Sequence, residues 1–189
     1  MLIYLLRHGR TTDSGTYSGS LDSDLCIEGT KQARHIASYC KTLQLDSCYC
    51  SPLQRCRKTF SLLELANDCI FDDNLREIDF GRWEGLTFAE ISRNDKAQFD
   101  LWVQQKEDFT FPGGEAIATF IKRVTTWFDE LLENEMNAVL IVTHGGVIRH
   151  ALCHLIGLDH SFAPAFHINE AGMAVVDCGD DWSTLIRLN

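Results

Sequence analysis

The sequence predicts an α/β fold with a mostly parallel central sheet between two layers of helices. Short apolar runs of strand length alternate with longer segments of helical periodicity, which is typical of parallel α/β sheets. Two of the apolar runs, in "LIYLLRHG" and "VLIVTHGG", lead into a histidine that is followed by glycine. With 189 residues, 45% of them hydrophobic, the chain fits one domain with a sizeable core, and we expect that domain to cover residues 1–189.

Apolar periodicity and turn residues predict the elements of the first half. Ser51 and Pro52 supply an N-cap and a first-turn proline, which predict a helix that continues to about Ala66. Thr87 and Glu90 have the spacing of a capping box, which predicts a short helix after Thr87. The other predicted elements are strands at 1–6, 47–50 and 69–71, a polar loop through Leu25 and a helix at 28–43.

The second half continues the alternation of helices and strands. Apolar residues at helical spacing predict a helix over Glu115–Leu132, directly after the irregular loop "FTFPGG" at 109–114. A buried strand is expected at Ala138–Val142, and the next helix, Val147–Ile156, is closed by Gly157. Strands at 173–176 and 184–188 complete the predicted sheet.

Composition and charge narrow the classes of function. The net charge of −10 argues against a nucleic-acid partner. The apolar runs are too short to span a bilayer, and the N-terminus lacks the basic flank and apolar region of a signal peptide. The eight cysteines include no Cys-x-x-Cys pair, which favours reduced core residues over disulfides or a metal site. We therefore expect a cytoplasmic protein with neither a membrane nor a nucleic-acid partner.

The two histidines that follow strands define the candidate site. Ligands of open α/β sheets gather beyond the carboxyl ends of the strands, and His8 and His144 follow two such ends. Arg7 stands beside His8, and neighbouring glycines let a ligand approach the backbone closely. Arg55 lies just inside the N-terminus of a predicted helix, whose free N–H groups favour an anion. The sequence thus predicts an anion-binding site, in which a few positively charged side chains gather although the net charge of the protein is negative.

Four motifs occur in the order seen in the histidine phosphatase superfamily, which is also called the phosphoglycerate-mutase-like family. They are Arg7-His8-Gly9, Ser51-Pro52-Leu53-x-Arg55, Glu77 within "LREIDFGRWEG", and Thr143-His144-Gly145-Gly146. The linking segments "EGTKQA" and "FPGGEA" also match, so the resemblance covers nearly the whole chain. It implies a three-layer, phosphoglycerate-mutase-like fold and hydrolysis of a small phosphorylated substrate with no metal ion or other cofactor.

Phosphate-ester chemistry gives each of these residues a role, and the resemblance implies the same roles. Neutral His8 attacks phosphorus and becomes a phosphohistidine, which divides one difficult step into two. Arg7 and Arg55 hold the phosphoryl oxygens, and a protonated His144 donates to them as well. Glu77 protonates the leaving oxygen and later activates water. The further expected contacts to the substrate are Thr11, Ser14 and Gly145.

Two residues depart from the motif Arg-His-Gly-Glu-Thr-x-x-Asn, which is common in the family. Arg10 replaces the acid, and Ser14 stands where the asparagine is expected. Ser14 can still donate a hydrogen bond to phosphate, with a shorter reach. Arg10 adds a cation near the mouth of the site unless Asp13 or another acid pairs with it.

Two further groups of residues have competing interpretations. His150 and His154 stand four residues apart on one predicted helix, a spacing that suits a metal ion. No third ligand is evident from the sequence, so we favour a structural role for this pair. The aromatic residues Trp102, Phe109 and Phe111 either line a leaving-group pocket or belong to the core.

Within the family, the sequence favours hydrolysis over phosphoryl transfer. The mutase branch usually has longer insertions and a C-terminal tail over the site, whereas this chain ends at Asn189, directly after a predicted strand. The compact length, "YSG" at 17–19, "LREIDFGRWEG" and the segment from Phe166 onwards resemble the α-ribazole-5′-phosphate phosphatases, which act in assembling the nucleotide loop of cobalamin. The alternative is a broad-specificity sugar-phosphate or phosphoprotein phosphatase.

A phosphate-binding regulatory module without turnover belongs to a different class of function. Such a module needs only the cations, whereas this chain also has a candidate nucleophile in His8 and a candidate acid in Glu77. The sequence therefore favours an enzyme. It is compatible with both a monomer and a homodimer.

Overall fold

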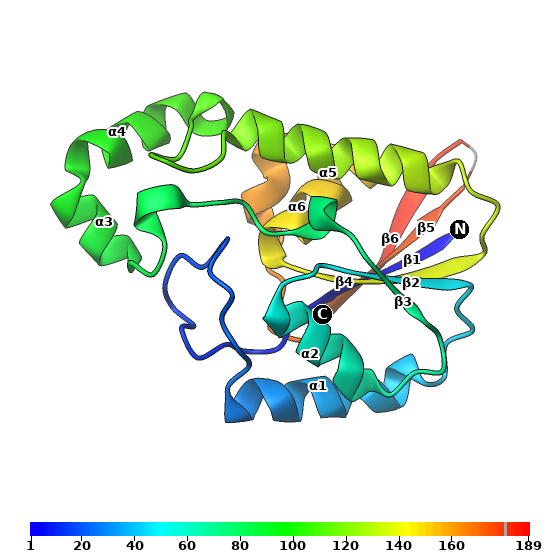
Figure 1. Cartoon of the computed structure of the whole chain (residues 1–189). Helices are drawn as coiled ribbons and strands as arrows, with labels where there is room; N and C mark the ends of the chain where they lie inside the picture. Colours follow the sequence, from blue (N-terminus) through cyan, green and yellow to red (C-terminus); the bar gives the residue numbers. More distant parts are fainter. Residues whose placement is uncertain (180) are drawn as a thin grey trace.

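A six-stranded sheet in the order β3-β2-β4-β1-β5-β6 forms the centre of the structure, a computed structural model that describes residues 1–179 and 181–189 (Figure 1). The first four strands along the chain run parallel to one another, while β5 runs antiparallel to β1 and β6 antiparallel to β5. The mostly parallel sheet predicted from the sequence is confirmed. The strands are β1 (Leu2–Arg7), β2 (Ser47–Cys50), β3 (Cys69–Phe71), β4 (Ala138–Thr143), β5 (Met173–Cys178) and β6 (Ser183–Leu188).

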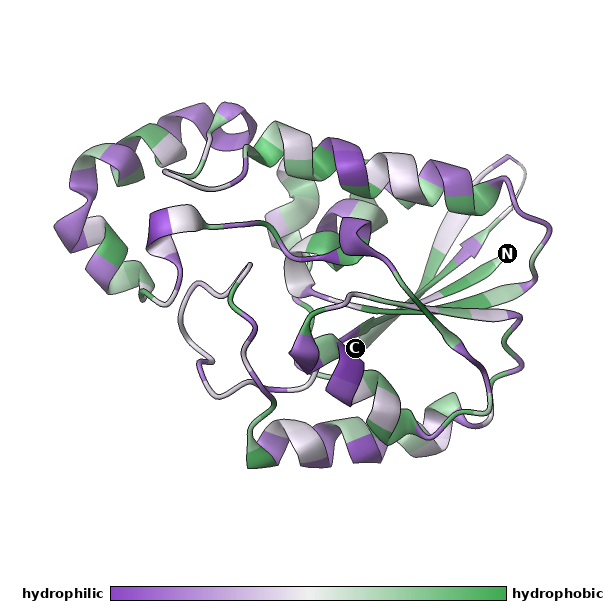
Figure 2. Ribbon diagram, in the orientation of Figure 1, coloured by the Kyte–Doolittle hydropathy of each residue, from purple (hydrophilic) through white to green (hydrophobic). Residues whose placement is uncertain are grey.

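Helices cover both faces of the sheet, which confirms the three-layer arrangement. One face carries α1 (Ile27–Cys40) and α2 (Gln54–Leu63), and the other carries α5 (Ile117–Leu132) and α6 (Gly145–Leu155) (Figure 1). The strands between these layers are coloured mainly as hydrophobic in Figure 2. Short 3-10 helices occur at Asp73–Leu75, Gly81–Trp83, Lys106–Asp108 and His160–Ala165.

Alternation along β4 builds a hydrophobic core on each side of the sheet. All six residues of β4 are buried. Val139 and Ile141 belong to the core beneath α5 and α6, whereas Leu140 and Val142 belong to the core beneath α1 and α2. Successive side chains of a strand point to opposite faces, so one apolar run serves both layers.

The register of the two central parallel strands places their ends side by side. Arg7, the last residue of β1, is paired with Thr143, the last residue of β4. The residues that follow, His8 and His144, therefore leave the sheet at neighbouring positions on its carboxyl edge. This is the juxtaposition that the sequence predicts.

A pair of helices extends beyond the sheet at the same end of the molecule. They are α3 (Phe88–Asn94) and α4 (Lys96–Gln105) (Figure 1). The predicted capping box opens α3, since Thr87 Oγ1 accepts from Glu90 N over 3.2 Å and Glu90 Oε2 accepts from Thr87 N over 2.8 Å. The sequence did not predict α4, because none of its residues is buried and no single face of it is apolar enough to show a helical stripe.

The start of α2 corrects one prediction. The helix begins at Gln54 with Leu53 as its N-cap residue, and not at Ser51-Pro52. The hydroxyl of Ser51 is instead 2.8 Å from His144 Nε2, so the residue expected to cap a helix serves the candidate site. The helix ends at Leu63 because Glu64 adopts the left-handed conformation with a φ of 51°.

All eight cysteines are free thiols, and six of them are buried. Within the described residues, no helix combines the length and apolar character needed to cross a membrane.

Candidate active site

The two predicted histidines meet at the carboxyl edge of the sheet. The ring centroids of His8 and His144 are 5.1 Å apart, with an angle of 62° between the ring planes. The backbone N–H of His8 donates to Thr143 O over 3.0 Å, which ties the residue after β1 to the end of β4. Sheet register, and not local sequence, brings the two motifs together.

His8 is held in the form that a nucleophile requires. Its Nδ1 lies 2.8 Å from the carbonyl oxygen of Gly9, and a carbonyl only accepts, so Nδ1 carries the proton. The lone pair is therefore on Nε2. Burial, together with the nearby charges of Arg55 and Arg7, lowers the pKa of His8 to about 3. His8 is thus a neutral imidazole at ordinary pH.

Arg7 and Arg55 supply positive charge beside His8. Both line a cavity of about 320 Å³ together with His8. Nη1 of Arg7 donates to Ile168 O over 2.7 Å, while its Nε is buried and has no hydrogen-bond partner among the described residues. A buried donor without a partner is costly, so the guanidinium of Arg7 has one N–H group that the described residues leave unsatisfied.

Arg55 also fixes a loop of the candidate site. Its side chain is almost fully buried, and it donates from Nη1 to Leu21 O over 2.6 Å and from Nη2 to Gly19 O over 2.8 Å. Glu84 binds the backbone N–H groups of the same loop, and it accepts from Ser20 N over 2.8 Å. The segment around "YSG" is therefore held in place by opposite charges.

His144 accepts a hydrogen bond from Arg55 in this structure. Arg55 Nε donates to His144 Nδ1 over 3.1 Å, so the imidazole proton is on Nε2, which faces Ser51 Oγ. Burial, followed by the charge of Arg55, lowers the pKa of His144 well below its usual value. The neutral ring is an acceptor that orients Arg55. Direct donation from a protonated His144 to a phosphoryl group stays a prediction.

Glu77 reaches the same cavity from the loop that follows the first 3-10 helix. Its Oε2 accepts from the backbone N–H of Gly146 over 2.9 Å, at the N-terminus of α6. A Cβ atom on Gly146 would lie 2.2 Å from Glu77 Oε1, so the position requires glycine if the carboxylate is to stay in place. The second glycine of the "THGG" motif therefore seats Glu77.

The predicted substrate contacts line the cavity as well, together with one acid that the sequence did not indicate. Thr11, Ser14 and Gly145 are all among the lining residues. Ser14 Oγ donates to Glu170 Oε1 over 2.8 Å, and Arg10 Nε is 3.9 Å from Glu170 Oε2. Glu170 is thus the acid that pairs with Arg10.

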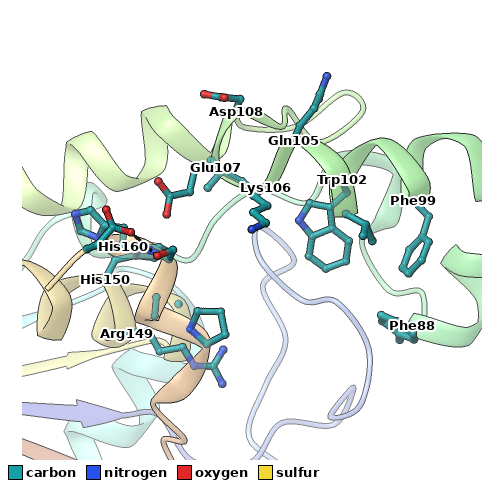
Figure 3. Close-up of a pocket in the computed structure, with 17 residues that line it drawn as sticks. Phe88, Phe99, Trp102, Gln105, Lys106, Glu107, Asp108, Arg149, His150 and His160 are labelled. Carbon is teal, nitrogen blue, oxygen red and sulfur yellow. Dashed lines mark hydrogen bonds between the residues drawn. The ribbon is translucent and has the colours of Figure 1, made fainter.

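A second, larger cavity of about 900 Å³ adjoins the first (Figure 3). Gly146 and Arg149 line both. Figure 3 shows Trp102, Phe99 and Phe88 on one side and His150, His160 and Glu107 on the other.

The three aromatic residues singled out in the sequence, Trp102, Phe109 and Phe111, lie in two different environments. Phe109 and Phe111 are core residues, each with 2% of its surface exposed, whereas Trp102 lines the large cavity.

His150 and His154 do not converge on a common point. His150 Nδ1 is 3.1 Å from His160 Nδ1, whereas His154 Nε2 is 2.6 Å from Asp129 Oδ1. Within residues 1–179 and 181–189, no group of three or more His, Cys, Asp or Glu side chains could hold a metal ion. The two histidines therefore have separate partners in this structure, His160 for His150 and Asp129 for His154.

Arg149 is a site residue that the sequence analysis missed. Its Nε donates to Phe166 O over 3.0 Å, which anchors the side chain between the two cavities. It lies three residues after Gly146, one helical turn along α6, so helical spacing from the "THGG" motif is the signal that could have found it. Glu170 stands in a loop before β5, where no comparable signal exists.

A family model described as the histidine phosphatase superfamily, branch 1, matches residues 3–189. The chain belongs to the histidine phosphatase superfamily. The family and the enzyme class expected from the four motifs, a phosphoric monoester hydrolase, are thereby confirmed.

Relatives of this histidine phosphatase carry the names of different substrates. Phosphoserine phosphatase 1 of Hydrogenobacter thermophilus is 31% identical over 192 residues, which cover 99% of this chain and 91% of the relative. The adenosylcobalamin/alpha-ribazole phosphatase of Escherichia coli is 26% identical over 196 residues, covering 100% of this chain and 96% of the relative. The crystal structure of the alpha-ribazole phosphatase from Shigella flexneri matches with a TM-score of 0.92 and 27% identity, covering 100% of this chain and 96% of that chain.

Proposed function

We propose that this histidine phosphatase is a metal-independent phosphomonoesterase that forms a phosphohistidine on His8. Its proposed substrate has a large, partly aromatic leaving group, and α-ribazole 5′-phosphate is the candidate. The observation that carries the choice of substrate is the 900 Å³ cavity that joins the catalytic cavity at Gly146 and Arg149.

In the first half of the reaction, the phosphoryl group is transferred from the ester oxygen to Nε2 of His8. The Nε2 lone pair of His8 attacks phosphorus while the bond to the ester oxygen breaks, and the carboxyl proton of Glu77 passes to that oxygen. Arg7 and Arg55 neutralise the charge on the transferring oxygens. The hydrogen bond from Nδ1 to Gly9 O holds the His8 ring with Nε2 turned away from the backbone.

In the second half, water releases the phosphoryl group. Glu77, now a carboxylate, takes a proton from a water molecule whose oxygen attacks phosphorus, and the bond from phosphorus to Nε2 breaks. Inorganic phosphate leaves, and His8 and Glu77 return to their starting forms. The hydrogen bond of 2.9 Å from Gly146 N keeps the carboxyl group in place through both steps.

The size and lining of the second cavity support a large leaving group. Its volume lies within the roughly 300–1,000 Å³ of pockets that enclose drug-sized ligands. Phe88, Phe99 and Trp102 offer aromatic surface on which a flat ring could stack (Figure 3). A relative with matching structure is named for alpha-ribazole, a substrate of this kind.

Phosphoserine is the second candidate substrate, because a relative named for it is 31% identical. The charges around the cavity are compatible with a zwitterion, since Lys106 and Arg149 are cationic while Glu107 is anionic. Against this candidate stands the aromatic lining, which a serine leaving group would leave without contact.

A comparison of kcat/KM values for α-ribazole 5′-phosphate, phosphoserine, ribose 5-phosphate and p-nitrophenyl phosphate tests the proposal. We expect α-ribazole 5′-phosphate to give the highest value. Trp102→Ala should lower it roughly 5- to 150-fold, the effect of losing one aromatic–base contact of ~1–3 kcal/mol, and should affect ribose 5-phosphate little. Trp182→Ala, at a position with 75% exposure, is the matched control. A higher value for phosphoserine, with no effect of Trp102→Ala, would contradict the proposed substrate.

A further inference from the structure

We propose that Arg123 is a positioning residue that holds the loop carrying Glu77. The inference rests on the proposed role of Glu77 as general acid. Arg123 lies on α5, far from the four family motifs in the sequence, and its side chain is 20% exposed. It does not line either cavity described above, so it acts on the reaction through another residue.

Every N–H group of the Arg123 guanidinium has a partner. Nε and Nη2 donate to the two carboxylate oxygens of Glu115, over 2.8 Å and 3.1 Å. Nη1 donates to the carbonyl oxygens of Asn74 and Arg76, over 2.6 Å and 2.9 Å, and Nη2 also donates to the carbonyl oxygen of Glu77 over 3.2 Å. An arginine has five such donors, and all five are used here.

The remaining carbonyl of the loop is held from the sheet. Thr143 Oγ1, at the end of β4, donates to Leu75 O over 2.7 Å. Four successive carbonyl oxygens, from Asn74 to Glu77, therefore accept hydrogen bonds from side chains. Residues 74–77 pair with no strand in the part of the chain that the structure describes, so these side chains provide the hydrogen bonds that a neighbouring strand provides elsewhere.

The geometry links Arg123 to catalysis through the position of one carboxylate. Proton transfer requires the Glu77 carboxyl group within hydrogen-bond reach of the leaving oxygen, and small displacements of catalytic groups are costly. The Glu77 carbonyl held by Arg123 belongs to the same residue whose Oε2 accepts from Gly146 N. Arg123 thus fixes the backbone of Glu77, and Gly146 fixes its side chain.

Lysine cannot replace Arg123 in this role. Its ammonium group has three donors on one atom and could keep the pairing with Glu115, but it could not reach that carboxylate and three separate carbonyl oxygens at once. Arg123→Lys is therefore a sharper variant than Arg123→Ala, since it retains the charge and loses the fork. Glu115→Gln is a second, milder variant, because it weakens the ion pair and leaves Arg123 in place.

The test compares substrates whose leaving groups differ in their need for a proton. Rates of His8 phosphorylation are measured in single turnovers with an alkyl phosphate and with p-nitrophenyl phosphate. We expect Arg123→Lys to lose about tenfold or more on the alkyl phosphate, but no more than the ~10²–10⁴ that general acid catalysis supplies, and clearly less on p-nitrophenyl phosphate. In a Glu77→Gln background, Arg123→Lys should add less than about twofold, because coupled residues are not additive. Glu115→Gln should show the same dependence on the leaving group with a smaller loss.

The control variant is Arg82→Lys. Arg82 forms an equally bidentate pair with Asp95, over 3.0 Å and 2.9 Å, in the same stretch of chain, but it donates to no carbonyl of the Glu77 loop. We expect this variant to leave both rates unchanged. Equal losses of Arg123→Lys on both substrates, no loss on either, or full additivity with Glu77→Gln would overturn the proposal. If Glu77→Gln itself loses equally on both substrates, the proposed acid is wrong, which is a distinct result.

Discussion

The backbone N–H of Gly146 donates to Oε2 of Glu77 over 2.9 Å, and a Cβ atom on Gly146 would lie 2.2 Å from Oε1 of the same carboxylate. The end of a flexible side chain can move away from such a clash, so the fold should tolerate Gly146→Ala while Glu77 is displaced. We therefore expect Gly146→Ala to lower kcat/KM on an alkyl phosphate by ~10²-fold or more, with a much smaller change in Tm.

Gly145→Ala is the comparison for this prediction. A Cβ atom there would lie 3.5 Å from Arg7 Nε, which is an ordinary contact. Its loss of kcat/KM should be clearly smaller than that of Gly146→Ala. Equal losses for the two alanine variants would show that the clash with Glu77 does not decide the effect.

The buried histidines should make the protein less stable in acid. Burial lowers the pKa of His8 to about 3 and that of His150 to about 4, and it lowers the pKa of His144 well below its usual value. Below pH ~6.5 the unfolded chain takes up protons that the native state excludes, so the free energy of unfolding falls as the pH drops. One pH unit below the ordinary pKa, each histidine accounts for up to about 1.4 kcal/mol.

Urea unfolding at pH 7 and at pH 5.5 measures this loss of stability. We expect His150→Gln to reduce the difference between the two pH values, because one buried titrating group is removed. His35→Gln changes an exposed histidine and should leave the difference unchanged. A loss that is the same in His150→Gln as in the parent protein would argue that His150 does not titrate in this way.

Chelation tests the source of positive charge in the site. Arg7 and Arg55 already face the cavity beside His8, so phosphatase activity should survive exhaustive treatment with EDTA. The measurement is kcat/KM before and after chelation. Loss of activity that one divalent cation restores would contradict the assignment of this role to arginines.

The sequence predicted the parts of the site that local pattern controls. Apolar runs and short motifs predict the ends of two strands just before His8 and His144, the parallel direction of most strands, and Glu77 within its motif. The resemblance to a family implied the catalytic roles of these residues, which no one of the residues indicates by itself. These features are local or repeat along the chain, and sequence reasoning finds them for that reason.

The features that sequence reasoning missed depend on contacts between distant segments. Arg123 meets carbonyl oxygens 46 to 49 residues away, and Ser51 contacts His144 across 93 residues. Helix α4 escaped notice because it buries no residue. Glu170 pairs with Arg10 only because β5 returns to the edge of β1. Tertiary structure, and not local propensity, places each of these groups.

The most direct test of this account is the site of covalent phosphorylation. His8 presents a neutral imidazole with its Nε2 lone pair free, because Nδ1 donates to Gly9 O over 2.8 Å. Brief reaction with ³²P-labelled substrate, followed by rapid quenching, should leave label on His8 that survives alkali and is lost in acid, as expected of a phosphoramidate. His8→Ala should neither become labelled nor turn over substrate. Label on a serine or on a carboxylate, or full turnover by His8→Ala, would contradict the account.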